Sequence, residues 1–145
     1  MIGQRGIAAV EFALVVPVLL VLLAGGVDIG FRIWARAALV DAVAQGAMYA
    51  FLTGPSVTAS AVAGFVEQAA AIPGVSATVS GPSSGCLAAG SPTLTAAASN
   101  GTCADGTKPG TFLTIAASAT AFSLSTTLWS EPGVSVSDQA MVRLQ

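Results

Sequence analysis

The sequence contains no histidine, and only 8% of its 145 residues are charged. Histidine is the commonest general base and metal ligand, so its absence argues against catalysis and against a metal site. The five basic residues are scattered along the chain and cannot form the continuous basic stripe that nucleic-acid binding requires. We therefore predict that the protein is not an enzyme, and that it has no cofactor, metal, small-molecule substrate or nucleic-acid partner.

Charge this scarce does not suit an ordinary soluble surface, on which about a quarter of all residues are charged. Hydrophobic residues make up 54% of the chain and aromatic residues only 6%. About half of the sequence consists of Ala, Gly, Ser and Thr, so any folded part must pack closely with few bulky side chains. These features predict a membrane-associated protein or a subunit of a polymer.

Residues 7–27 form one apolar run, IAAVEFALVVPVLLVLLAGGV, whose single charge is Glu11. At about 1.5 Å per residue, a helix of this length can cross a bilayer. Arg32, Trp34 and Arg36 follow the run, as residues that anchor a helix at the membrane interface do. We predict a transmembrane segment over residues 7–27.

Beyond this run, apolar residues recur every three or four positions, which predicts one continuous helix from about Gly6 to Leu52. We expect residues 28–54 to form its amphipathic continuation. Gly26 and Gly30 have the G-x-x-x-G spacing that permits close helix packing, although such spacing also arises by chance in a chain rich in glycine and alanine. The recurring apolar residues are Ile29, Ile33, Ala37, Val40, Ala44, Ala47 and Phe51.

The remainder, residues 55–145, is predicted to be a small extracytoplasmic α+β domain. Its pattern favours a short second helix and an antiparallel sheet of about three strands. The helix is expected at Thr58–Ala71 and the strands at Val75–Ser80, Thr111–Phe122 and Gly133–Leu144, with a turn ending in Glu131-Pro132-Gly133. The Gly- and Pro-rich stretch Gly81–Gly110 is the candidate loop.

This candidate loop contains the two cysteines of the chain, Cys86 and Cys103. In such polar surroundings a thiol is a poor core residue, so we predict a disulfide formed in an oxidising compartment. The disulfide would close a loop of about 18 residues and contribute about 3 kcal/mol to stability. Two unpaired thiols are the alternative.

The first six residues form a short leader that contains Arg5 and ends in Gly6. If a peptidase cut after Gly6, the new amino group would lie on Ile7, and Glu11 would become the fifth residue. The first and fifth residues of a helix share a face, so the ammonium and the carboxylate could meet within one chain or between neighbouring subunits. The alternative is that Glu11 lies among the lipid headgroups, where its charge costs less.

The stretch Gly6-Ile7-Ala8-Ala9-Val10-Glu11-Phe12 resembles the processing motif of type IV pilin-like proteins. The longer run Arg5–Pro17 is similar to the start of the TadE-like pseudopilins of tight-adherence (Tad/Flp) pilus systems, and the ending Ala140–Leu144 fits the same family. The resemblance implies that a membrane-embedded prepilin peptidase cuts after Gly6, that Ile7 is the mature N-terminus, and that Glu11 and Phe12 serve assembly. Phe12 replaces the Tyr of the major pilus subunit, which indicates a minor component.

The resemblance thus implies a minor pilin in the bacterial inner membrane, with a single span and a periplasmic C-terminal part, which becomes extracellular once it enters a pilus. Its partners would be the membrane, the prepilin peptidase, other pilin or pseudopilin subunits and the pilus assembly platform. One alternative is a secreted or periplasmic binding module that ordinary signal peptidase releases before Val27, since Ala24 and Gly26 are small residues at suitable positions. Another is a pseudopilin of a different secretion system.

Overall fold

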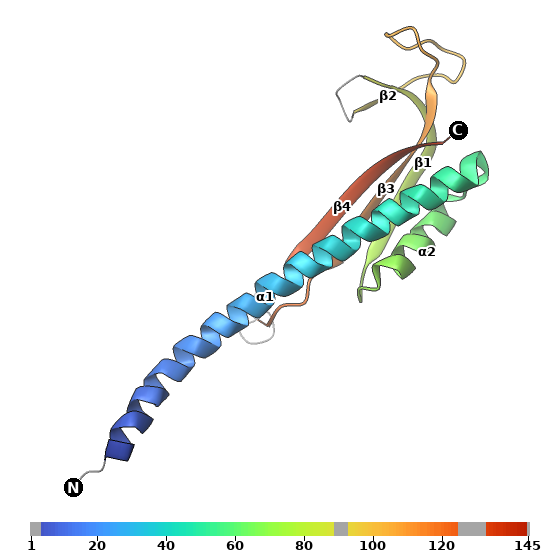
Figure 1. Ribbon diagram of the computed structural model, residues 1–145. Coiled ribbons are helices and arrows are strands. Elements are labelled where there is room, and N and C mark those ends of the chain that lie inside the picture. Colours follow the sequence, from blue (N-terminus) through green and yellow to red (C-terminus); the bar gives the residue numbers. More distant parts are fainter. Residues whose placement is uncertain (1–3, 89–92, 125–132, 145) are drawn as a thin grey trace. The chain divides into compact units, whose positions relative to one another are not determined.

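The computed structural model describes residues 4–88, 93–124 and 133–144 (Figure 1). It confirms the α+β class, with a long N-terminal helix, a short second helix and an antiparallel sheet. The elements are α1 (Gln4–Thr53), a 3-10 turn η1 (Gly54–Ser56), α2 (Ala59–Ala70), β1 (Ser76–Leu87), β2 (Leu94–Ala96), β3 (Gly110–Thr120) and β4 (Ser135–Leu144). Internal contacts divide the chain into two units, residues 1–34 with 121–134 and residues 35–120 with 135–145.

The helix α1 extends the predicted one by two residues at its start and one at its end. It continues through Pro17, which lacks the N–H that would otherwise bond to the carbonyl of Ala13. The helix ends where Gly54 adopts a positive φ of 70° and Pro55 follows. A left-handed glycine after the last turn is a common helix stop, so this end was readable from the sequence.

The second helix, α2, begins at the N-cap residue Thr58, whose hydroxyl oxygen accepts a hydrogen bond from the Ala61 N–H at 3.3 Å. An N-cap of this kind satisfies one of the helix's free amide groups. Tyr49 of α1 stacks on Phe65 of α2, with ring centroids 5.0 Å apart and planes 8° apart. This stacking contributes to holding α2 beside the end of α1.

The sheet has four antiparallel strands in the order β2-β1-β3-β4, one more than predicted. Strand β1 runs on to Leu87, well into the candidate loop, and its last residues pair with the short β2. The register between β1 and β3 shifts between Ser80 and Ser83, where Gly81 has a φ of 112°. A bulge therefore accommodates the Gly-Pro step that made this stretch look like a loop. Residues 131 and 132 of the predicted turn lie outside the described residues.

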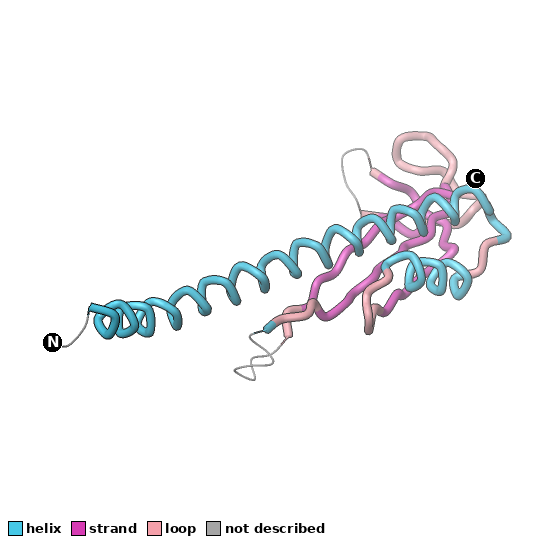
Figure 2. The backbone as a smooth tube through the Cα atoms, turned by 60° about the horizontal axis from the view of Figure 1, so that its bottom comes forward, coloured by secondary structure: helices cyan, strands magenta, loops and turns pink. Residues whose placement is uncertain are grey.

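The core of the second unit lies between the sheet and the two helices, which cover the same face of the sheet (Figure 2). The strand register places Val79, Ile115 and Ala140 in one row on that face. Fully or nearly fully buried residues of α1, α2 and β3 complete the core, namely Leu39, Ala42, Val43, Ala50, Val62, Val66, Leu113 and Ile115. None of these side chains is aromatic, in keeping with the low aromatic content of the chain.

A side chain of α2 forms a hydrogen bond with the backbone of β1, in the part of the strand that does not pair with β2. The Ala77 N–H donates a hydrogen bond to Oε1 of Glu67 at 3.0 Å. An edge strand with free amide groups invites pairing with other chains, and a charged side chain on the edge prevents this. Glu67 is therefore engaged within its own unit.

The apolar row read from the sequence lies mainly on the solvent side of α1. In the second unit Val40 is 41% exposed and Met48, on the same side, is 56% exposed, whereas Leu39 and Val43 face the core. This part of α1 is apolar almost all the way round, so its periodicity alone did not decide which side is buried. The buried side is the one that includes Ala42, Gly46 and Ala50, whose small size lets the helix approach its neighbours closely.

Gly46 of α1 lies directly against Val66 of α2. A Cβ atom there would lie 2.3 Å from Cγ2 of Val66, so the position has no room for a side chain. By contrast, a Cβ at Gly64 of α2 would meet nothing within 4 Å.

We expect Gly46→Ala to lower the free energy of unfolding of the second unit by about 1–3 kcal/mol, because the added methyl group overpacks the helix contact. Gly64→Ala is the matched control and should raise it by about 0.5–1 kcal/mol, because alanine favours a helix interior. Hydrogen exchange of the β3 amides in the full chain, held in detergent micelles, measures both changes. Equal effects of the two substitutions would show that the contact is not tight.

Candidate functional site

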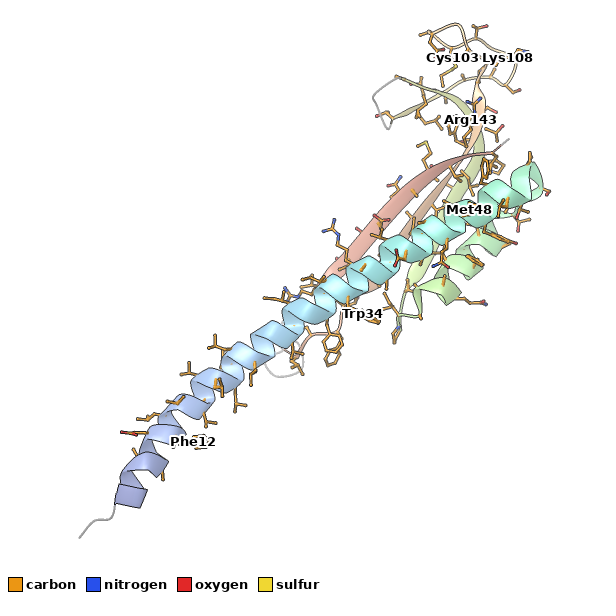
Figure 3. All side chains as sticks on the ribbon, viewed as in Figure 1. Phe12, Trp34, Met48, Cys103, Lys108 and Arg143 are labelled. Carbon is orange, nitrogen blue, oxygen red and sulfur yellow. A yellow bond between two sulfur atoms is a disulfide. The ribbon has the colours of Figure 1, made fainter. Side chains whose placement is uncertain are left out.

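The first half of α1 is uncovered by the rest of the chain. Among the described residues, the segment Ala9–Ser56 contains the one helix that is long and apolar enough to cross a membrane by length and composition. Only 6% of its most apolar window is buried, and Phe12 is 70% exposed. Figure 3 shows apolar side chains projecting from this half of the helix. Such a surface must be covered by lipid or by other helices.

Glu11 is exposed on this apolar helix, and it has no hydrogen-bonding or ionic partner among the described residues. Gly6 and Ile7 lie in the first turns of α1, but the side chains of residues 4–8 are outside the described part of the structure. The pairing of Glu11 with an amino group on Ile7 therefore stays a prediction, as does the assembly role of Phe12.

Gly26 and Gly30 leave the helix surface open. Both are exposed, and a Cβ atom at either position would meet nothing within 4 Å. Another helix could therefore approach the α1 backbone closely here. Their role in helix packing remains a prediction.

Asp28 forms a buried polar contact that the sequence did not reveal. Its side chain is 7% exposed, and its Oδ2 accepts a hydrogen bond from the Ser123 hydroxyl at 2.9 Å. Its Oδ1 accepts a second hydrogen bond from the Leu124 N–H. Phe122 packs edge-on against Phe31, with ring centroids 5.3 Å apart. Residues 121–124 are thus fastened to α1 just after the predicted transmembrane segment.

Asp28, Arg32 and Arg36 are spaced four residues apart on α1, so their side chains project from one side of the helix. Only Arg36 is fully exposed, and the Nε of Arg32 is buried with no hydrogen-bond partner among the described residues. Ser123 and Leu124, which donate hydrogen bonds to Asp28, lie more than ninety positions later in the chain. Helical spacing cannot predict a contact between residues so far apart in the sequence. The one sequence feature that could have indicated it is the position of an acid next to an apolar stretch.

Asp28→Ala should free residues 121–124, because it leaves the Ser123 hydroxyl and the Leu124 amide without their acceptor. Loss of hydrogen bonds to a buried carboxylate costs about 1–3 kcal/mol, which corresponds to about 5- to 150-fold acceleration of exchange at the Leu124 amide. Hydrogen-exchange mass spectrometry of the full chain in micelles measures this. Asp41→Ala, which removes an exposed carboxylate from the same helix, should not change it. Unchanged exchange in the Asp28 variant would mean that the contact does not fasten the segment.

The second unit contains the predicted disulfide between Cys86 and Cys103, with Cα atoms 5.6 Å apart. The bond links the end of β1 to the turn that precedes β3. Within that turn, the Cys103 N–H donates to the Thr107 carbonyl oxygen at 2.8 Å, and the Gly106 N–H donates to the Cys103 carbonyl oxygen at 2.9 Å. The turn is therefore fixed both covalently and by backbone hydrogen bonds.

A groove of about 600 Å³ lies beside this disulfide, lined by the ends of β1 and β4, the start of β3 and the turn 105–108. Its apolar part includes Leu87 and Met141, and its cationic side chains are Lys108 and Arg143. Figure 3 labels Cys103, Lys108 and Arg143 at this end of the unit. Sequence reasoning did not foresee the groove, because its residues come from four separate segments.

Arg143 is positioned in the groove without a carboxylate partner. Its guanidinium lies 6.0 Å from the centroid of the Phe112 ring, a cation–π contact. A Cβ atom at Gly110 would lie 2.7 Å from the Nε of Arg143, so the arginine occupies space that only glycine leaves. Neither Arg143 nor Lys108 forms an ion pair with a residue that the structure describes.

Asp105 also lines the groove, but its carboxylate is engaged in its own turn. Its Oδ1 accepts hydrogen bonds from the Thr107 N–H at 3.0 Å and from the Thr107 hydroxyl at 2.7 Å. These bonds, the backbone one first, hold the pKa of Asp105 below its ordinary value. In the described part of the chain, no group of three or more His, Cys, Asp or Glu residues could hold a metal ion.

Residues 6–48 match the family model described as TadE-like protein. The match begins at Gly6, includes the whole apolar run and continues along α1 to Met48. Over this part of the chain it confirms the TadE-like resemblance drawn from the N-terminal motif. No curated protein and no solved structure matches the chain.

Proposed function

We propose that this TadE-like chain is a minor pilin or pseudopilin that a prepilin peptidase cleaves after Gly6 and that takes part in assembly of a Tad/Flp adhesion pilus. One observation carries the proposal, namely that the TadE-like match includes the apolar run of residues 9–27, whose exposed surface contains a single carboxylate, Glu11. In this role the chain is a substrate of processing chemistry and has no catalytic activity of its own.

The exposed apolar side chains of α1 explain how one helix serves in two environments. Lipid covers them before assembly, and the helices of neighbouring subunits cover them afterwards. Transfer between two apolar environments gains little hydrophobic free energy, so packing and polar pairing must favour the fibre. The open helix surface at Gly26 and Gly30 supports close packing, and Glu11 supports polar pairing.

Cleavage after Gly6 supplies the partner that Glu11 lacks. The new ammonium on Ile7 is a charge that a neighbouring subunit can present to the Glu11 carboxylate in surroundings of low dielectric constant. Attraction between opposite charges is much stronger there than in water. Processing would therefore convert a stored membrane helix into one that pairs in a defined register.

The proposed topology is a single inner-membrane span with the N-terminus in the cytoplasm and the C-terminal part in the periplasm. The disulfide between Cys86 and Cys103 supports this, because disulfides persist in oxidising compartments such as the periplasm. The partners would be the prepilin peptidase, other pilin or pseudopilin subunits and the pilus assembly platform.

The N-terminus of the cellular protein tests the processing step. We expect intact mass and N-terminal sequencing to find Ile7 as the first residue, and we expect Gly6→Leu to accumulate uncut. The matched control is Gly25→Leu, which changes another exposed glycine of the same helix and should still be cut. A mature protein that begins at Val27 would instead identify ordinary signal peptidase and refute the pilin pathway.

Glu11→Gln tests the assembly step, because it removes the charge and keeps the size of the side chain. We expect normal membrane insertion and at least about a tenfold loss of the protein from sheared pilus fractions, since a buried ion pair that loses one partner costs several kcal/mol. Asp138→Asn, a change in the second unit, is the control and should be recruited normally. Equal recruitment of the Glu11 variant and the parent would contradict a role for the carboxylate.

A further inference from the structure

The described carboxylates fall into two groups. Asp28, Glu67 and Asp105 accept hydrogen bonds within the chain. Glu11, Asp41 and Asp138 have no partner among the described residues, and of these Asp41 is exposed on α1 in the second unit. An exposed acid is ordinary by itself, so its surroundings decide whether it matters.

Asp41 lies on an apolar side of α1 that the described chain leaves uncovered. We call this side the outer helix face and define it by Ala37, Val40, Asp41, Ala44 and Met48, all of which are exposed. Val40 and Met48 lie eight residues apart, about two helical turns, with the carboxylate and Ala44 between them. The face thus combines aliphatic surface with one negative charge.

The groove beside the disulfide has the complementary chemistry. Leu87 and Met141 supply aliphatic surface, and they are 45% and 36% exposed. Lys108 and Arg143 supply two positive charges, and neither forms an ion pair with a described carboxylate. Asp105 keeps its negative charge while it accepts hydrogen bonds from Thr107, so the groove has a net positive charge of one. The residues of the groove and those of the outer helix face are different, and both sets belong to the second unit.

We propose that the outer helix face of one copy of this chain docks in the groove of a second copy, with the Asp41 carboxylate beside Lys108 and Arg143. Val40 and Met48 then cover Leu87 and Met141. Because the contact joins two different patches, it is heterologous and can repeat from copy to copy. Its placement in a pilus rests on the proposed function, whereas the contact itself does not.

Part of the groove is already held in place before a partner binds. The disulfide fixes the backbone of the turn that contains Lys108, and the exposed Arg143 side chain lies beside Phe112 and Gly110. A turn whose backbone is already held loses little conformational entropy on binding. Met48 and Met141 add unbranched, adaptable surfaces that fit an aliphatic contact without a strict shape requirement.

A carbodiimide tests this contact, because it joins a carboxylate and an amine directly, with loss of water and no spacer. Lys108 is the single lysine of the chain, so a crosslink through a lysine can start only there. We expect treatment of the full chain in nanodiscs or native membranes to give an Asp41–Lys108 linked peptide and a ladder of dimers, trimers and larger species. A mixture of isotopically labelled and unlabelled chains should yield linked peptides that contain both isotopes, which proves that the link is between copies.

Substitutions make the test specific. Asp41→Asn should reduce the linked ladder at least tenfold, and Asp138→Asn, a matched control at another carboxylate without a partner among the described residues, should not. Asp41→Lys alone and the pair Lys108→Glu with Arg143→Glu should each lower association, and mixing these two variants should restore it.

A ladder that stops at the dimer, or a Lys108 crosslink to a different carboxylate, overturns the proposal. So does loss of association in the groove variants alone, which would assign the groove to another partner.

The result is separable from the proposed function, because the crosslink needs neither the prepilin peptidase nor a pilus. Absence of the linked peptide, together with an Ile7 N-terminus and normal recruitment to pili, overturns the contact alone. A linked ladder from a chain that is not cut after Gly6 and is not recruited overturns the pilin function alone.

Discussion

The structure depends on an apolar helix that its own chain does not cover. From Ala9 to Val27 the side chains of α1 form almost no internal contacts, so the stability of this segment must come from lipid or from other subunits. Placing a charged group on such a helix costs free energy unless the group has a hydrogen-bonding or ionic partner. The partners of the two acids of this region are therefore informative. Asp28 is hydrogen-bonded by a later segment of the chain, whereas Glu11 is left exposed.

The second unit solves a different problem, which is how to build a core from small side chains. Alanine and glycine bury little apolar area, so the helices and the sheet must approach closely enough for many short contacts. Gly46 against Val66 is one of these approaches. The disulfide and the stacked pair of Tyr49 and Phe65 add stability that a bulky core would otherwise supply.

Features with a local cause could be predicted from the sequence. The length of α1, its stop at Gly54 and the helix beginning after Thr58 depend on residues next to each other, and the N-terminal motif is contiguous. Features that depend on distant residues could not be predicted. The partners of Asp28, the buried side of α1 and the groove at Arg143 each require segments that only the fold brings together. The Gly81-Pro82 step led to a wrong prediction, because it favoured a loop that begins at Gly81. In the structure, a bulge lets β1 continue through these two residues, which usually end a strand.

The division of the chain into two units has a mechanical consequence. The polypeptide passes between the units three times, after residues 34, 120 and 134, so no single linker joins them. A pull on the N-terminal helix is therefore shared among α1 and the segments that lead from β3 and into β4. The hydrogen bonds of Asp28 to residues 123 and 124 tie two of these connections together within the first unit.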